Sequence, residues 1–364
     1  MKKTIALILT LTLLAALLSG CTGTTVVVGN CTCPTGSHDA TEATTPEDTT
    51  PDGTVAAEGA LKTGLSVSVN MADSTSATAE AKGAAKYDVT LAAVTVDDNG
   101  VIVSCKIDSI PATVEFDNTG AIVTELPADI ATKNELGENY GMVAYGGAVA
   151  EWDAQVAAVA KYAEGKTVEQ LKNGDIDMTT GKAKDGSDLS SSATIYLAGY
   201  VYAIEAAVNN AKHLGAQTGD ELVLTTMNTA DGSPAQEEGG AAQLDSTIAV
   251  LTRKDGVITS CYIDALQAQV AFDATGTITT DLTAPVQTKN ELGENYGMVA
   301  YGNAIAEWNE QAAAFASYVT GKTAEEVAGI AVTETTKPAD GSDLASSVTI
   351  AIGGFQALIA KAMQ

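Results

Sequence analysis

A run of hydroxylic side chains after an aspartate holds the residue types that bind phosphate groups. It is DLSSSAT at residues 188–194, and an apolar segment that predicts a helix follows it. Hydroxyl donors, free backbone N–H groups and the positive end of a helix dipole together suit a phosphate. The same side chains would also cap the helix without any ligand, so a phosphate site and plain capping both stay open. The candidate residues are Asp188, Ser191, Ser192 and Thr194.

This run resembles the C-terminal signature of the FMN-binding domain family, in which Asp is followed after two residues by Ser or Thr, Gly, Ala and Thr. The family includes respiratory and extracellular electron-transfer flavoproteins, and a flavin transferase joins FMN to its last threonine through a phosphoester bond. The resemblance implies FMN as the cofactor and Thr194 as its attachment residue. Ser192 stands where the family has glycine, so covalent attachment stays open.

A second run of the same kind, DLASSVT, occupies residues 343–349 and departs further from the family, since Val348 replaces the alanine. By the same resemblance, its candidate FMN-binding residues are Asp343, Ser346, Ser347 and Thr349.

Fifteen residues, TKNELGENYGMVAYG, occur without a difference at 132–146 and at 288–302. Aromatic and thioether side chains in this stretch could stack on a flavin ring, and its glycines would let a ligand approach the backbone. The alternative is a glycine-shaped loop whose Tyr and Met pack under the next helix. The candidate residues are Tyr140, Met142, Tyr296 and Met298.

Several classes of site are disfavoured by composition. The net charge of -27 makes nucleic acid a poor partner, and with only His38 and His213 neither a catalytic triad nor a histidine metal centre can occur in both copies. Gly165-Lys166-Thr167 lacks the upstream glycine of a phosphate loop, because Ala160 stands there. It predicts a helix end followed by a helix cap.

The cysteines indicate anchoring rather than disulfide chemistry. Lys2 and Lys3 precede an uncharged apolar run that ends in Leu18-Ser19-Gly20-Cys21, which resembles a bacterial lipobox. We expect residues 1–20 to be a signal peptide, Cys21 to carry a lipid that holds the chain on the outer face of the cell membrane, and residues 21–60 to be a flexible stalk. Cys31 and Cys33 lie in that stalk, whereas Cys105 and Cys261 lie singly in predicted strands and are expected to be buried.

An internal repeat organises the rest of the chain. An offset of 156 residues aligns the two identical stretches, and also Cys105 with Cys261 and Trp152 with Trp308. This predicts two tandem domains of about 150 residues, each able to bury its own core. They are the first half (61–215) and the second half (216–364).

Each half is expected to place strands before helices. Each half contains two segments in which β-branched runs flank a glycine turn. They are 87–108 and 112–126 in the first half, and 246–264 and 268–282 in the second. This pattern predicts two hairpins, and so four antiparallel strands, per half. Val149, Trp152, Val156 and Val159 then step by three, four and three residues, which predicts a helix. The order predicts an α+β fold, a small antiparallel sheet packed with helices.

Two functions fit these features. The first is a membrane-anchored flavin module that exchanges electrons with redox partner proteins. The second is a non-catalytic surface lipoprotein that binds a small solute or an envelope protein. No imidazole base or metal-ligand set supports a hydrolase or a metalloenzyme.

Overall fold

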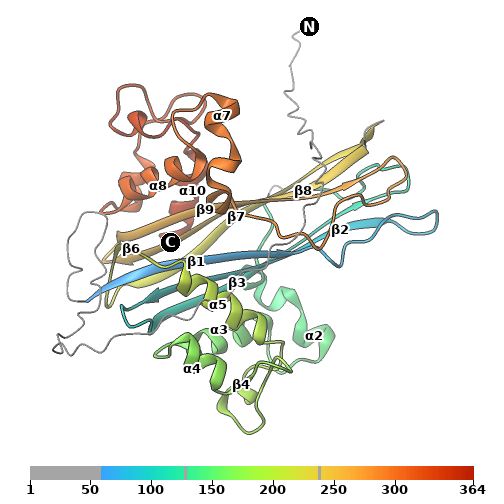
Figure 1. The fold of residues 1–364 in the computed structure, drawn as a ribbon, viewed down its shortest axis with the longest axis horizontal. Coiled ribbons are helices and arrows are strands. Elements are labelled where there is room, and N and C mark those ends of the chain that lie inside the picture. The colour runs from blue at the N-terminus through green and yellow to red at the C-terminus, as the bar shows by residue number, and fades with distance from the viewer. Residues whose placement is uncertain (1–58, 127–128, 237–238) are drawn as a thin grey trace, which may run out of the picture. The chain divides into compact units, whose positions relative to one another are not determined.

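The computed structural model describes residues 59–364, except 127–128 and 237–238 (Figure 1). Within them lie antiparallel sheets and ten α-helices, so the expected mixture of helices with antiparallel strands is confirmed. The predicted signal peptide, Cys21, Cys31, Cys33 and nearly all of the predicted stalk lie outside the described residues.

The first sheet has the strand order β3-β2-β1-β6, and every neighbouring pair is antiparallel. Its strands are β1 (Ala60–Asn70), β2 (Gly83–Val96), β3 (Ile102–Phe116) and β6 (Lys212–Gln217). The second sheet has the order β7-β8-β9, formed by β7 (Glu221–Gln236), β8 (Gly239–Lys254) and β9 (Val257–Phe272). A short ladder joins β4 (Ile176–Asp177) to β5 (Lys182–Ala183).

The prediction of two hairpins per half was wrong. One long hairpin, β2 with β3, replaces them in the first half, and after the turn at Gly120 only a single bridge forms, between Phe116 and Ile122. Strand β3 continues through Asp108 and Pro111, and so joins the two predicted hairpins. Proline is tolerated because β3 is an edge strand, where a missing N–H donor leaves no ladder bond unmade.

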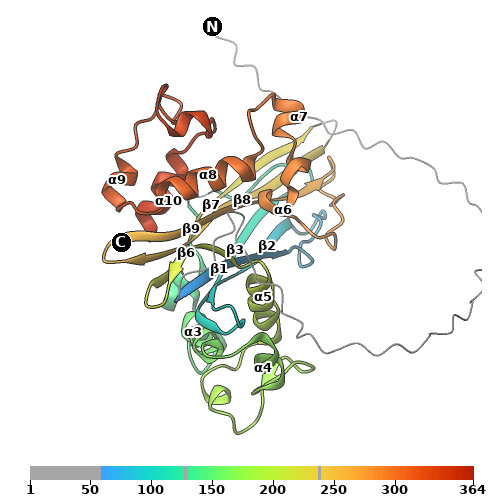
Figure 2. The same cartoon turned by 60° about the vertical axis from the view of Figure 1, so that its left-hand side comes forward.

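The two sheets face each other and share one hydrophobic cluster (Figures 1 and 2). Phe116 of β3 stacks on Phe272 of β9 with ring centroids 4.0 Å apart and planes 8° from parallel. Each ring lies beside a glycine of the neighbouring strand: a Cβ at Gly83 would meet the Phe116 ring at 2.4 Å. The Tyr87 hydroxyl donates to the Ala242 carbonyl, 2.8 Å away, so the halves also share a buried hydrogen bond.

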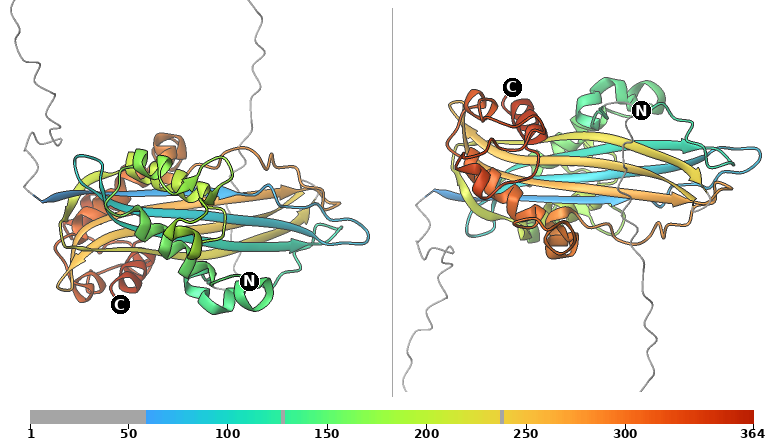
Figure 3. Two further views of the ribbon diagram at one scale, coloured as in Figure 1. Left: turned by 90° about the horizontal axis from the view of Figure 1, so that it is seen from below. Right: turned by 90° about the horizontal axis from the view of Figure 1, so that it is seen from above.

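Helices cover the outer face of each sheet (Figures 2 and 3). In the first half, α3 (Trp152–Ala163) packs on β3, and α5 (Ala198–Asn209) packs on β1 and β2. In the second half, α8 (Trp308–Val319) packs on β9, and α10 (Gly353–Ala362) packs on β7 and β8. The layers therefore run helix, sheet, sheet, helix.

The predicted helix periodicity is confirmed from Trp152 onward, since Trp152, Val156 and Val159 are all buried. The prediction that Val149 is a core position of this helix was wrong, because Val149 precedes α3 and is 64% exposed. The predicted cap at Thr167 is present as a capping box, and Thr323 forms the same capping box in the second half. The Gly-Lys-Thr sequence of each half therefore ends one helix and caps the next. The helices that they cap are α4 (Val168–Asn173) and α9 (Ala324–Ala328).

The remaining helices are short. They are α1 (Lys133–Leu136), η1 (Gly137–Tyr140), α2 (Met142–Gly146), η2 (Asp188–Ser191), α6 (Lys289–Leu292), η3 (Gly293–Tyr296), α7 (Met298–Gly302) and η4 (Leu344–Ser346). Among the described residues, no helix is long and apolar enough to cross a membrane.

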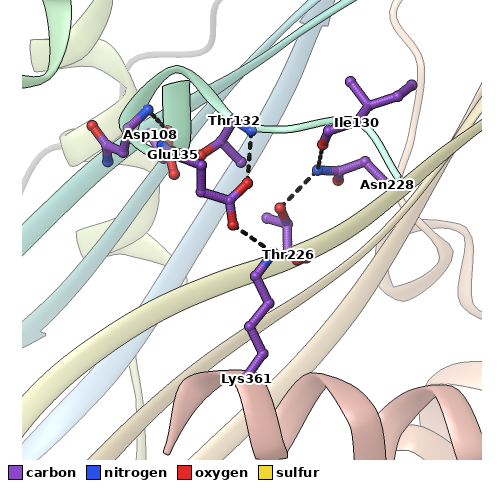
Figure 4. Close-up of polar contacts among 8 residues, drawn as sticks. Asp108, Ile130, Thr132, Glu135, Thr226, Asn228 and Lys361 are labelled. Carbon is purple, nitrogen blue, oxygen red and sulfur yellow. Dashed lines mark hydrogen bonds and ion pairs between the residues drawn. The ribbon is translucent and has the colours of Figure 1, made fainter. Parts of the chain in front are cut away.

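Polar contacts also join the two halves (Figure 4). The Asn228 side chain donates to the Ile130 carbonyl at 2.9 Å, and the Ile130 N–H donates to the Asn228 carbonyl at 2.9 Å. Lys361, at the end of α10, pairs with Glu135 of the first repeated stretch. The sequence-based boundary after residue 215 falls inside β6, which pairs with β1.

Candidate functional site

The threonine implied as the flavin attachment residue is held by a buried glutamine. Gln155 on α3 is fully buried, and its Oε1 accepts from the Thr194 N–H at 2.8 Å, the Thr194 hydroxyl at 3.2 Å and the Ile195 N–H at 3.3 Å. Its Nε2 donates to the Ala150 carbonyl at 2.8 Å. Gln155 therefore fixes the chain that leads into α5, while Thr194 itself stays exposed.

The second half repeats this arrangement. Gln311 on α8 accepts from the Thr349 N–H at 2.7 Å, from the Thr349 hydroxyl at 3.2 Å and from the Ile350 N–H at 3.2 Å. Sequence reasoning missed both glutamines. The available signal was a glutamine three residues after the tryptophan in each half, at a position that faces the core of the predicted helix.

The sequence suggested that the serine runs form the first turn of the helix. In the structure they do not. Residues 188–191 form the separate 3₁₀ turn η2, and α5 begins only at Ala198. Their hydroxyls donate to carbonyls of the same turn: Ser191 to Asp188 at 2.9 Å, and Ser192 to Asp188 at 3.3 Å. In η4, Ser346 bonds to Asp343 at 2.8 Å and Ser347 to Leu344 at 3.3 Å. Asp188 and Asp343 are exposed.

An aromatic pocket of about 510 Å³ begins one residue after Thr194. Ile195 forms part of its wall, whereas Thr194 is not one of its lining residues. Trp152 of α3 and Tyr200 of α5 meet edge to face with centroids 6.1 Å apart, and the Trp152 Nε1 donates to the Tyr200 hydroxyl at 3.0 Å. Tyr196 and Tyr202 also line the pocket, and their exposed fractions are 61% and 53%. Strands β1 and β2 contribute Ser66, Ser68, Asp88 and Thr90 to its polar wall. Asn210 and Glu291 complete that wall.

A buried lysine lies behind this pocket. The Lys133 ammonium is 5.3 Å from the centroids of both the Tyr140 and the Trp152 rings, and it pairs with Asp88 at 3.1 Å. Burial is the largest influence and lowers the pKa of Lys133, but Asp88, together with Tyr140 and Tyr200, raises that pKa above its usual value. The Lys133 charge therefore contacts the Trp152 ring and is paired with Asp88, a carboxylate of the pocket wall.

The candidate residues of the repeated stretch lie outside this pocket. Tyr140 and Met142 are partly buried against the cluster under α3 and α5, and Tyr140 lines a separate cavity with Lys133. Tyr296 and Met298 pack the same way in the second half. These four side chains therefore pack below the helix that follows each stretch.

A buried aspartate anchors the start of each stretch. Asp108 of β3 accepts from the Asn134 N–H at 3.2 Å, and Asp264 of β9 accepts from the Asn290 N–H at 3.1 Å. Burial raises the pKa of both carboxyl groups, that of Asp264 to about 6, although the backbone N–H of Asn290 and the Thr288 hydroxyl counteract the shift. A buried strand aspartate thus holds the repeated loop in place in each half.

Asp264→Asn should alter how stability depends on pH. Between about pH 4 and 6 the folded chain keeps the Asp264 proton, whereas an unfolded aspartate, with a pKa of about 3.9, releases it. The stability that this group allows is therefore full below about pH 4, and it is lost as the pH rises through about 6. Asparagine retains the acceptor oxygen. We expect little change at about pH 4 and a gain of up to about 3 kcal/mol at about pH 8, measured by urea unfolding. An unchanged pH slope, or a gain equally produced by Asp281→Asn at an exposed site, would contradict this.

The second half lacks two of the pocket's aromatic side chains. Ala351 and Ala357 stand where the first half has Tyr196 and Tyr202, once the single deletion is allowed for. Trp308 keeps an edge-to-face partner in Phe355, with centroids 6.0 Å apart. Only the first half therefore combines the threonine with exposed rings.

The two cysteines of the described residues, Cys105 and Cys261, are free and buried as predicted, and burial raises the pKa of each thiol to about 12. Within the same residues, no group of His, Cys, Asp or Glu side chains could hold a metal ion. Comparison of the chain with protein-family models, with characterised proteins and with solved structures found no match.

Proposed function

We propose that this protein is a flavin-binding electron-transfer module that carries FMN in its first half. The observation that carries the proposal is the aromatic pocket beside Thr194. Its volume of about 510 Å³ lies within the roughly 300–1,000 Å³ of small-molecule sites. Trp152, Tyr196 and Tyr202 offer ring faces and edges for an isoalloxazine, and Ser66 with Thr90 offers hydrogen bonds for its polar edge.

The exposed position of Thr194 supports attachment through its side chain. Gln155 fixes the Thr194 hydroxyl, and the net charge of -27 makes capture of a free phosphate unfavourable. A phosphoester bond would remove the need to attract the anion. Bound there, FMN would supply one- and two-electron transfer, while the protein would hold and orient its ring.

The setting of this module is part of the proposal. The sequence Leu18-Ser19-Gly20-Cys21 supports a lipid anchor at Cys21 and an extracytoplasmic location, where redox proteins would be its partners. We also infer that the two halves arose by tandem duplication. The identical fifteen residues and the matching contacts of Gln155 and Gln311 support this. The changes to Ala351 and Ala357 support loss of the flavin site from the second half.

The test is the colour of the protein. The full chain, produced with its own signal in bacteria that express a flavin transferase, should be yellow with absorbance at about 450 nm and one flavin per chain. Flavin that remains after denaturation should map to Thr194 by mass spectrometry, which would also detect lipid on Cys21.

Matched variants locate the cofactor. Thr194→Val should abolish covalent flavin, whereas Thr349→Val should leave it unchanged, because Thr349 has no exposed tyrosines beside it. A protein that remains colourless after co-expression and after incubation with FMN would refute the proposal. Flavin on Thr349 alone would refute its assignment to the first half.

A further inference from the structure

A cavity of about 590 Å³ lies where β6 meets the second sheet. Its lining comes mainly from β9 and α8, and the start of β6 supplies one side. Strand β6 approaches β9 closely because Gly215 has no side chain: a Cβ there would lie 2.4 Å from the Thr259 carbonyl oxygen. The volume lies within the roughly 300–1,000 Å³ of small-molecule sites.

The charged lining of this cavity is basic. Lys212 and His213 of β6 line it, and no aspartate or glutamate does. Four other cavities of the described residues are each lined by at least two carboxylates. Asp98, which is not a lining residue, faces His213, with its Oδ1 3.1 Å from the His213 Nε2. In a chain with 46 acidic residues against 19 lysines and arginines, this lining is an exception that favours an anionic ligand.

Lys212 is the charge that a ligand can reach. Its ammonium lies 6.0 Å from the centroid of the Tyr262 ring, which also lines the cavity. Lys212 lines a smaller cavity too, together with Asp264 and Glu291, but within the described part of the chain its side chain forms no ion pair with either. An anion beside Tyr262 would therefore gain an ion pair without breaking one.

The remaining lining suits the apolar body of a ligand. Ala313 and Ala316 of α8 are small, so they leave space between the helix and Ile263 of β9. Burial raises the pKa of the Cys261 thiol to about 12, so the thiol stays protonated and uncharged. An aromatic ring placed there would lose its contact with water and meet the Tyr262 ring.

The net charge of -27 does not exclude such a ligand. At physiological ionic strength, charges more than about 8 Å away are largely screened, so Lys212 dominates the field close to the cavity. A monocarboxylate carries one charge and also gains from burial of its apolar body. A free phosphate carries more charge and has no apolar body, so the acidic surface opposes it more strongly.

The first half has a cavity of about 430 Å³ at the equivalent place, between β3 and α3. Cys105 and Cys261, 156 residues apart, line the two cavities at matching positions. No strand like β6 lines the first-half cavity, and its charged lining residues carry both signs: Lys106, Asp153, Lys161 and Glu164. It therefore serves as an internal control.

We propose that the second-half cavity binds a small aromatic monocarboxylate, whose carboxylate pairs with Lys212 beside Tyr262 and whose ring lies between β9 and α8. The site does not depend on the flavin proposal.

The probe is 3-phenylpropionate, and its matched neutral analogue is 3-phenylpropanamide. Titration calorimetry on the full-length protein should give one phenylpropionate per chain, with the amide binding at least about 10-fold more weakly because it cannot form the ion pair. Absence of phenylpropionate binding, or equal binding of the acid and the amide, would overturn the proposal.

A lysine variant and its control test the ion pair. Lys212→Met keeps the aliphatic stem but removes the charge, so it should weaken phenylpropionate at least about 10-fold and change amide binding less than about 2-fold. Lys254→Met, at an exposed lysine of β8, makes the same change in net charge and should leave both affinities unchanged. Equal weakening by the two variants would show a general effect of charge and overturn the assignment to Lys212.

A second pair of variants locates the ring. Ala313→Trp fills the space beside Ile263 from an exposed helix position and should abolish phenylpropionate binding. Ala157→Trp, at the equivalent position of the first half, should leave it unchanged. Equal helix content by circular dichroism would show that both variants fold. Loss of binding in Ala157→Trp with retention in Ala313→Trp would overturn the assignment to the second half.

Discussion

Phe116→Ala should lower the free energy of unfolding by about 3–5 kcal/mol. The Phe116 ring is fully buried, lies beside Gly83 and stacks on Phe272 of the other half, so alanine would leave a cavity between the two sheets. Urea unfolding followed by circular dichroism measures the change. Because the stack belongs to a cluster that both halves share, we expect a single transition for the whole described region.

The stacked pair also has an internal test. A double-mutant cycle with Phe272→Ala should give a coupling energy of about 0.5–1.5 kcal/mol beyond the area buried. Tyr145→Ala is the control, since that ring is 92% exposed and should cost less than about 0.5 kcal/mol. Two separate transitions for the wild-type protein would show that the halves are stable independently and would contradict the shared core.

Gln155→Leu should lower the free energy of unfolding by about 3–5 kcal/mol, because each buried polar group left unpaired costs about 1–3 kcal/mol. Leucine fills the space but removes the acceptor of the Thr194 and Ile195 N–H groups and the donor to the Ala150 carbonyl. Hydrogen exchange at residues 194 and 195 should accelerate more than exchange in β2, which would separate local release from general loss of stability.

Two further variants define this effect. Gln311→Leu should cost a similar amount, since its contacts are the same within 0.1 Å. Gln287→Leu, at an exposed glutamine, should change stability by less than about 0.5 kcal/mol. A small effect of Gln155→Leu, equal to that of Gln287→Leu, would show that the bonds at Thr194 contribute little to the fold.

The accuracy of the sequence predictions follows from how local each signal is. The helix stripe of Trp152, Val156 and Val159 and the capping box at Thr167 depend on residues a few positions apart, and both are present. The burial of Cys105 and Cys261 follows from their apolar neighbours along the strand. In contrast, β1 and β7 were not predicted at all, because their pairing partners define them more than their composition does.

The gap between the two predicted hairpins, at residues 109–111, shows why local signals fail in this chain. Asp and Pro are rare inside strands, so no local signal joins the two predicted hairpins across Asp108 and Pro111. In the structure Pro111 lies on an edge strand, and the buried Asp108 uses its carboxylate to hold Asn134, twenty-six residues away. Neither compensation can be inferred from neighbouring residues.

The sequence by itself determined the internal repeat, the mixed composition of helices and antiparallel strands, and Thr194 as a residue worth testing. Only the tertiary structure decided that the halves share a core through Phe116 and Phe272, that Gln155 holds Thr194, and that aromatic rings gather beside it in one half alone. The physical reason is sequence separation: these contacts join residues from 39 to 156 positions apart, and no local propensity or periodicity records which distant surfaces meet.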